Sequence, residues 1–131
     1  MRRIRNIVIH CSDSPELMPV TADDIHQWHL ARGWAGIGYH YVVLRDGFIE
    51  AGRPEYWVGA HVDRHNADTI GICLIGRSHF TAEQDRALRR LVERLIVRYD
   101  DAGVVGHRDL AKGKTCPNFD AREWWKGMAL P

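Results

Sequence analysis

The sequence predicts an α/β fold in which a single mixed β-sheet is flanked by helices. Short apolar runs typical of buried strands, at residues 7–9 and 70–75, alternate with amphipathic stretches that have helical spacing. An Asp-Gly pair between two apolar runs adds an antiparallel hairpin, so the sheet is expected to be mixed. Alternation of this kind places helices on the faces of the sheet. We expect residues 1–131 to form one domain.

The chain begins with a predicted strand and helix. Residues 4–10 contain the apolar run Ile-Val-Ile and end at a histidine. Thr21 precedes a helix with two aspartates in its first turn, where the positive end of the helix dipole favours carboxylates. Ile25 and Trp28 supply the expected apolar stripe of this helix, and Gly33 is its expected stop.

A hairpin is predicted next. Apolar runs at residues 39–44 and 48–51 flank Arg45-Asp46-Gly47, and an Asp-Gly turn requires positive φ. We expect residues 57–61 to form another short extended piece.

The second half of the chain contains the clearest helix. Residues 70–75 are apolar and β-branched and predict a central strand. Thr81 and Gln84 have the spacing of a capping box, and residues 104–106 predict a short last strand. Asp120 is expected to cap a final short helix that holds two tryptophans. The long helix after Thr81 carries its apolar residues at helical spacing: Leu88, Leu91, Val92, Leu95, Ile96 and Tyr99.

Composition excludes several classes of protein. Apolar residues make up 45% of the chain and charged residues 27%, as in soluble globular proteins, and the formal net charge of +1 indicates no nucleic-acid partner. The sequence contains no signal-peptide pattern and no segment able to insert into a membrane, so we expect synthesis in the cytoplasm. Three cysteines argue against a disulfide framework, and Cys73 is expected to be a buried apolar residue.

The stretch at residues 107–116, HRDLAKGKTC, carries the densest chemistry. Gly113 within it and Pro117 after it predict a loop rather than a helix. His107 and Cys116 at its ends are both common zinc donors, although their spacing fits no short zinc-finger pattern. These two residues alone therefore do not decide whether the chain has a metal site.

A third candidate ligand lies at the other end of the chain. His10 and His107 each follow an apolar strand, and parallel neighbouring strands would place both at one edge of the sheet. Two imidazoles and one thiolate leave the fourth corner of a zinc tetrahedron open, as in catalytic sites. Such a centre lowers the pKa of a bound water toward ~7 and polarises a carbonyl. Taken alone, His10 would more simply be a structural histidine at a strand end.

Five segments of the chain together resemble a known family. They are HCSDSP from His10, QWHLARGWAGIGYHYVVLRDG from Gln27, VGAH ending at His61, IGICLIG from Ile70, and HRDLAKGKTCPNFD from His107. In this order they resemble the phage-type N-acetylmuramoyl-L-alanine amidases, a zinc family related to the peptidoglycan recognition proteins. The resemblance covers nearly the whole chain and implies the fold of that family.

The resemblance implies roles for individual residues. His10, His107 and Cys116 correspond to the ligands of one Zn²⁺ ion, and Tyr39 corresponds to a catalytic tyrosine beside the metal-bound water. Lys114, two residues before the cysteine, takes the place of the catalytic lysine. Because residues 107–116 are one residue longer than in a phage relative, Lys112 remains an alternative to Lys114.

These residue types suit amide hydrolysis. An ammonium at Lys114 would stabilise the tetrahedral oxyanion, and such preorganised charge is often the largest contribution to catalysis. Tyr39, with an ordinary pKa of ~10, is better suited to orient the water or to pass on its proton. We expect His61 and, more weakly, Asn66 to contact the substrate. Structural roles are expected for the other histidines, namely His26, His29, His40, His65 and His79, and Cys11 is expected to point away from the metal.

The expected function is that of an endolysin, a peptidoglycan hydrolase that cleaves the amide between N-acetylmuramic acid and L-alanine. The expected enzyme waits in the cytoplasm, reaches the cell wall after another protein opens the membrane, and acts as a monomer. Two alternatives stay open: a cytosolic amidase that recycles muropeptides, and a non-catalytic module that binds peptidoglycan. The resemblance also raises a phage RNA polymerase as a partner.

Overall fold

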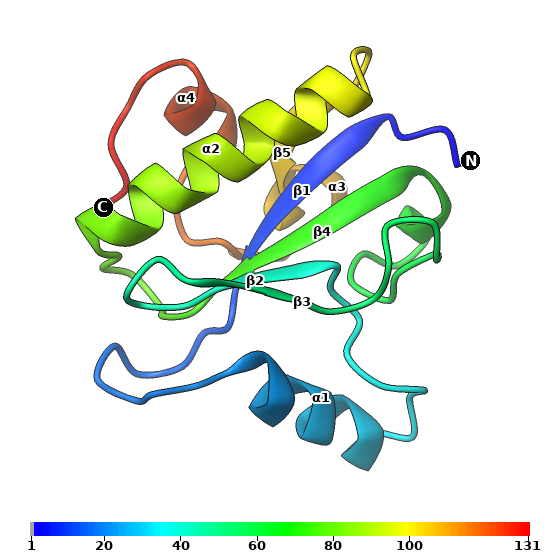
Figure 1. Ribbon diagram of the computed structural model, residues 1–131, viewed down its shortest axis with the longest axis vertical. Coiled ribbons are helices and arrows are strands. Elements are labelled where there is room, and N and C mark those ends of the chain that lie inside the picture. The colour runs from blue at the N-terminus through cyan, green and yellow to red at the C-terminus, as the bar shows by residue number, and fades with distance from the viewer. Residues whose placement is uncertain (1) are drawn as a thin grey trace.

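The computed structural model describes residues 2–131 and contains a five-stranded mixed sheet with helices on both faces (Figure 1). Its strand order is β3-β2-β4-β1-β5, and only the β2–β3 pair is antiparallel. The mixed α/β fold predicted from the sequence is confirmed. The strands are β1 (Asn6–Cys11), β2 (Tyr41–Val43), β3 (Ile49–Ala51), β4 (Thr69–Leu74) and β5 (Gly103–Gly106).

Helices α2 and α4 cover one face of the sheet, and α1 lies beyond the other face (Figure 1). Within residues 2–131, no helix combines the length and the apolar character needed to cross a membrane. The helices are α1 (Ala22–Ala31), α2 (Ala82–Arg98), α3 (His107–Leu110) and α4 (Ala121–Trp125), with a 3-10 turn η1 (Asn66–Asp68) before β4.

The face under α2 holds the larger hydrophobic core. The predicted capping box forms: the Thr81 side chain accepts the Gln84 N–H, and the Gln84 side chain accepts the Thr81 N–H. The Gln84 side chain is fully buried and also donates to the Val43 and Ile75 carbonyls, which fixes the start of α2 against the sheet. The core contains alternate residues of β1 and β4 and the inner residues of α2: Ile7, Ile9, Ile70, Ile72, Leu74, Leu88, Leu91, Val92 and Leu95.

The polar side chains of the candidate site lie on the opposite face of the sheet. Val8 of β1 packs there against Val105 of β5 and Val62 of the loop before η1. His10, two residues after Val8, projects to the same face because side chains alternate along a strand. This face is therefore where a site at the ends of β1 and β5 must open.

Helix α1 buries a different residue from the one expected. Ile25 is 2% exposed, as predicted, but Trp28 is 38% exposed and lies outside the core. His29 is buried instead, and its Nδ1 accepts the Gly38 N–H at 2.9 Å. Gly33 adopts φ of 86° just beyond the helix, which confirms the predicted stop.

The predicted hairpin forms, and its turn contains the expected residue with positive φ. Gly47 has φ of 87°, whereas Asp46 has no positive φ and its carboxylate accepts the Phe48 N–H at 2.9 Å. Residues 57–61, which were predicted to be extended, form no strand and consist of bends and irregular backbone. Their backbone is instead held by isolated hydrogen bonds. One of these runs from the Ala60 N–H to the Gly38 carbonyl at 3.0 Å.

Candidate active site

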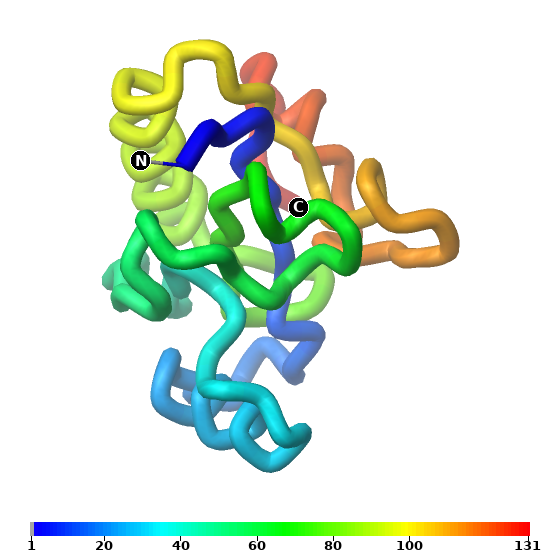
Figure 2. Tube along the Cα trace, turned by 90° about the vertical axis from the view of Figure 1, so that its right-hand side faces the viewer, coloured from blue at the N-terminus to red at the C-terminus, as the bar shows by residue number. Residues whose placement is uncertain are grey.

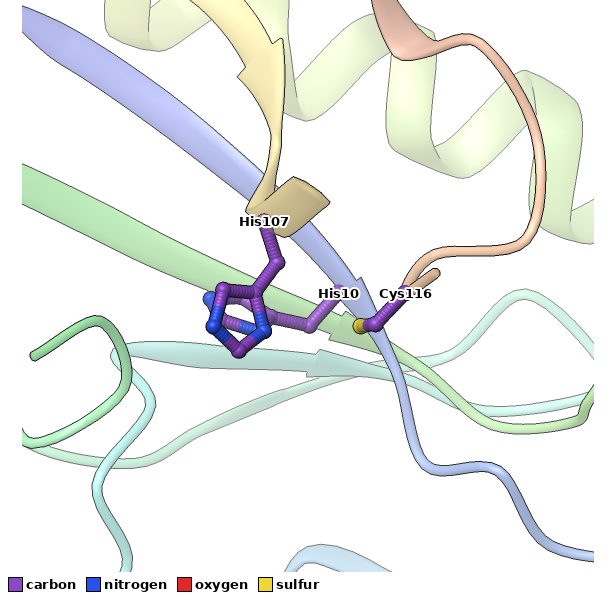
Figure 3. Close-up of side chains that lie close together, drawn as sticks. All are labelled: His10, His107 and Cys116. Atoms are coloured by element: carbon purple, nitrogen blue, oxygen red, sulfur yellow. The ribbon is translucent and has the colours of Figure 1, made fainter. Parts of the chain in front are cut away.

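Two neighbouring parallel strands bring His10 and His107 together. Strands β1 and β5 pair in parallel with Ile9 opposite Gly106, so the next residue of each strand is a histidine. The two imidazole rings lie 4.6 Å apart between centroids, and Figure 3 shows them beside the thiol of Cys116. The predicted meeting of the two strand ends is confirmed.

The segment from His107 to Cys116 begins as a helix, contrary to the predicted loop. Residues 107–110 form the single turn α3, and the Gly106 N–H donates to the Asp109 carboxylate at 2.8 Å at its start. The turn then ends, and Gly113 with φ of 85° reverses the chain. The prediction failed because a single helical turn requires only one or two local hydrogen bonds, which Gly113 does not disturb.

A backbone hydrogen bond closes this segment into a loop. Arg108 N–H donates to the Cys116 carbonyl at 2.8 Å, which holds Cys116 next to His107. Figure 2 shows the segment after β5, in orange, extending away from the body of the molecule. The two candidate ligands at its base are thus fixed, whereas its outer residues are exposed.

The three predicted ligands form a cluster that suits one metal ion. The ligand atoms of His10, His107 and Cys116 all lie within 4.8 Å of one another. Two imidazoles and one thiol are a donor set that zinc prefers, with a fourth position left open. The Cys11 N–H donates to Sγ of Cys116 at 3.2 Å, a bond that would stabilise a thiolate. The residues present therefore fit a zinc ion.

Cys11 lies closer to this cluster than expected. Its backbone N–H donates to Sγ of Cys116 at 3.2 Å, and its own thiol accepts from Nδ2 of Asn118 at 3.6 Å. It is not one of the three clustered ligands, as predicted. The neighbouring thiol of Cys11, together with burial, raises the pKa of Cys116 above its usual range, so a nearby cation would be needed to hold the thiolate form.

Tyr39 packs directly on the candidate metal ligand His10. The two rings lie 5.0 Å apart between centroids, with an angle of 59° between their planes. Burial raises the pKa of Tyr39 well above its ordinary value, and the neighbouring cysteines add to this effect. The Tyr39 hydroxyl is therefore protonated near pH 7.

Lys114 is the lysine that acts electrostatically on the cluster. Burial lowers the pKa of His107, and the charge of Lys114 lowers it further. Lys114 itself is exposed. Lys112 has no comparable effect on His10, His107 or Cys116.

His61 and Asn66 use their polar atoms within the protein. Nδ1 of His61 lies 2.8 Å from Nε2 of His10, and Nε2 of His61 lies 3.1 Å from Oγ1 of Thr69. Oδ1 of Asn66 accepts the N–H groups of His61 and Val62 at 2.8 and 2.9 Å. Burial lowers the pKa of His61 to about 3, and neighbouring His40 and His107 add to the effect. His61 is thus neutral near pH 7.

Three other histidines have the expected structural roles. His26 and His29 accept the N–H groups of Ile37 and Gly38, and His40 accepts that of Gly71. Each imidazole thus pairs a backbone donor that the sheet leaves free. Sequence reasoning did not single out Thr69, because a threonine at the start of a strand has nothing in its flanking residues to mark it.

Comparison with known proteins agrees with this geometry. A family model described as N-acetylmuramoyl-L-alanine amidase matches residues 1–119, which include all three clustered ligands. The chain belongs to this amidase family. The resemblance inferred from the five sequence segments is confirmed.

Relatives of the chain include phage proteins and recognition proteins. The endolysin of Klebsiella phage KP32 is 41% identical over 95% of this chain and 87% of its own length. The endolysin amidase LysCS from Clostridium intestinale superposes with a TM-score of 0.82 at 33% identity, over 88% of this chain and 76% of that one. A point mutant of Drosophila PGRP-LB in complex with tracheal cytotoxin superposes with a TM-score of 0.79 at 28% identity, over 89% of this chain and 76% of that one.

Proposed function

We propose that residues 1–131 form a single zinc amidase catalytic domain with the activity of an endolysin. The reaction is hydrolysis of the amide between N-acetylmuramic acid and L-alanine in peptidoglycan. The observation that carries the proposal is the cluster of His10, His107 and Cys116 within 4.8 Å, in a chain that belongs to the amidase family. The phage endolysins at about 40% identity support the biological role.

The metal supplies part of the chemistry. When bound, Zn²⁺ activates a water molecule and polarises the scissile carbonyl. His10, His107 and Cys116 would hold the ion, and the Cys11 N–H would stabilise the thiolate. Three protein ligands leave room at the exposed side of the cluster for a substrate to approach.

Two other side chains complete the proposed mechanism. The exposed ammonium of Lys114, near His107, would face the oxygen that becomes negatively charged in the tetrahedral intermediate. The protonated hydroxyl of Tyr39, whose ring packs against that of His10 at an angle of 59°, would orient the attacking water by a hydrogen bond. The role of Lys112 as the alternative lysine is less favoured, because it exerts no comparable charge effect on the cluster.

The predicted substrate contacts of His61 and Asn66 stay predictions. Both ring nitrogens of His61 and the amide oxygen of Asn66 already have partners in the protein. This favours a supporting role for both residues.

The remaining expectations follow from the endolysin role. We propose a monomer that is made in the cytoplasm, acts on peptidoglycan, and reaches the wall once another protein opens the membrane. A phage RNA polymerase stays a candidate partner. The cytosolic recycling of muropeptides is the alternative amidase role.

Product analysis tests the reaction. Defined peptidoglycan is digested with the wild-type protein and with Cys116→Ala, and the products are identified by mass spectrometry. We expect free stem peptides that begin with L-alanine, and their loss in the variant. Products cut between sugars would contradict the amidase proposal.

Two further measurements separate the alternatives. Activity on soluble anhydro-muropeptides with none on intact sacculi would favour the recycling role over the endolysin role. A purified protein that contains no zinc, and that cleaves no amide after zinc is added, would favour the non-catalytic binding module.

A further inference from the structure

His10 is connected to the interior of the protein by a chain of hydrogen bonds. Its Nε2 lies 2.8 Å from Nδ1 of His61, and the two rings meet nearly edge to face at 81°. Nε2 of His61 lies 3.1 Å from Oγ1 of Thr69, which donates to the His65 carbonyl at 2.8 Å. His10 is 1% exposed and Thr69 is fully buried. One nitrogen of His10 is thus used internally, which leaves Nδ1 as its free ligand atom.

The far end of this chain sets the direction of every hydrogen bond in it. The His65 carbonyl can only accept, so Thr69 uses its single hydroxyl proton there and must accept from Nε2–H of His61. A neutral imidazole carries one N–H, so Nδ1 of His61 accepts from Nε2–H of His10. His10 then has its lone pair on Nδ1, which is the form that a metal ion requires.

Two glycines leave the space that His61 fills. A Cβ on Gly71 of β4 would lie 2.6 Å from Cγ of His61, and one on Gly59 would lie 2.7 Å from its Cδ2. Both distances are too short for a real side chain, so no other residue at these positions leaves the imidazole in place. With Asn66 holding its backbone, His61 is fixed on several sides.

We propose that His61 is a positioning residue that holds His10 in the Nε2–H tautomer, with Nδ1 directed to the metal. The inference rests on the proposed function of the cluster as a metal centre. Hydrogen-bond partners of this kind orient metal-binding histidines and raise their basicity. His61 would thus act through His10 and would not need to touch the substrate.

Zinc affinity of His61 variants tests the proposal. His61→Leu removes both hydrogen bonds and should weaken zinc binding about 10- to 100-fold, as measured by competition with a chromogenic chelator. His61→Asn should recover part of this loss, because Oδ1 of asparagine can take the place of Nδ1. Thr69→Val should weaken binding less, since it removes only the outer hydrogen bond. Zinc affinity equal to wild type in both His61→Leu and Thr69→Val would overturn the proposal.

A matched control lies in the same loop. His65→Asn also removes an imidazole but keeps the backbone carbonyl that accepts from Thr69. Its zinc affinity should stay within about twofold of wild type, below the range expected for lost metal-supporting contacts. A loss as large as that of His61→Leu would mean that the loop tolerates no histidine substitution, and would contradict a specific role for His61.

The tautomer of His10 can be measured without metal or activity. Nitrogen-15 NMR of the metal-free wild-type protein should show a single Nε2–H form of His10, and His61→Leu should show a mixture. An Nδ1–H form in the wild type would overturn the proposal, even if no variant folds. A wild-type protein that binds no zinc, yet shows the Nε2–H form, would contradict the proposed function and leave the positioning of His10 by His61 supported.

Discussion

The two sides of the candidate centre are built in different ways. His10 projects from the C-terminal end of an inner strand, is almost fully buried, and is connected through His61 to Thr69. His107 and Cys116 lie at the base of a segment that extends outward, and they are only partly buried. The first ligand is thus held by the core, whereas the other two are held by a single loop.

This difference separates two requirements of a hydrolytic centre. A buried, hydrogen-bonded ligand fixes the position and tautomer of its nitrogen at all times. An outward loop leaves the open side of the cluster accessible and places the charge of Lys114 beside His107. We therefore expect substitutions on the core side to affect folding and activity together, and substitutions on the loop side to affect activity alone.

The largest effect is expected for Cys116→Ala. Loss of one of three ligands should remove stoichiometric zinc and reduce amidase activity by at least about 10³-fold, since the chemistry depends on the ion. The partly buried thiol contributes little to folding, so the free energy of unfolding of the metal-free protein should change by about 1 kcal/mol or less. Zinc analysis, turnover and urea unfolding measure these three quantities. A variant that keeps its zinc would show that Cys116 is not a ligand.

Lys114→Ala should have the next largest effect. Removal of a preorganised charge that faces a developing oxyanion lowers kcat by about 10²- to 10³-fold. The zinc content should stay at the wild-type level, because Lys114 is not a ligand. Lys112→Ala is the matched control, with the same change of charge two residues away in the same loop. Equal losses in both variants would contradict the assignment of Lys114.

His10→Ala should differ from Cys116→Ala in folding. The substitution leaves a cavity and removes the partner of His61 in the buried hydrogen-bond chain. Costs of this kind are about 2–4 kcal/mol in the free energy of unfolding. Urea unfolding of the two metal-free variants measures the difference. If both lose the same free energy, the contrast between the core side and the loop side is wrong.

The smallest effect is expected for the exposed Glu16 carboxylate. Its contribution to stability can be compared with that of the buried hydrogen-bond chain of His10. The Glu16 carboxylate accepts the N–H groups of Arg77, Ser78 and His79 at 2.7–3.1 Å, and these bonds, that of Ser78 first, lower its pKa from 4.5 to about 2. Its contribution to stability is therefore complete above pH ~4.5 and is lost as the pH falls toward 2. The urea midpoint should fall more steeply between pH 5 and 2.5 for the wild type than for Glu16→Gln. If the urea midpoints of the wild type and Glu16→Gln fall in parallel with pH, the hydrogen bonds of Glu16 add nothing to stability.

Sequence patterns predicted the elements whose causes are local. The strands at β1 and β4 follow from apolar runs, and α2 follows from its capping box and apolar spacing. The meeting of His10 with His107 could be predicted because both histidines end a strand in a parallel arrangement. Cys116 was first singled out as a zinc donor at the end of one polar segment, and only the resemblance to the amidase family joined it with His10 and His107 in one ligand set.

Features that depend on the assembled backbone could not be predicted. His29 is buried and Trp28 is exposed because a free N–H at Gly38 lies where only an imidazole at position 29 reaches it. The link from His61 to Thr69 requires β4 and the preceding loop to be in place. These residues can be seen in the sequence, but the hydrogen bonds that give each its role form only in the folded chain.

The parallel pairing of β1 with β5 has a consequence for the synthesis of the protein. His10 lies near the start of the chain and Cys116 near its end, so an ion held by both closes a loop that includes most of the polypeptide. Closing so long a loop in a disordered chain carries a large entropic cost, so the nascent chain should not hold zinc at this site. The metal would enter only after the last strand has joined the sheet, and a peptide truncated before Cys116 would be inactive however well its first strands had folded.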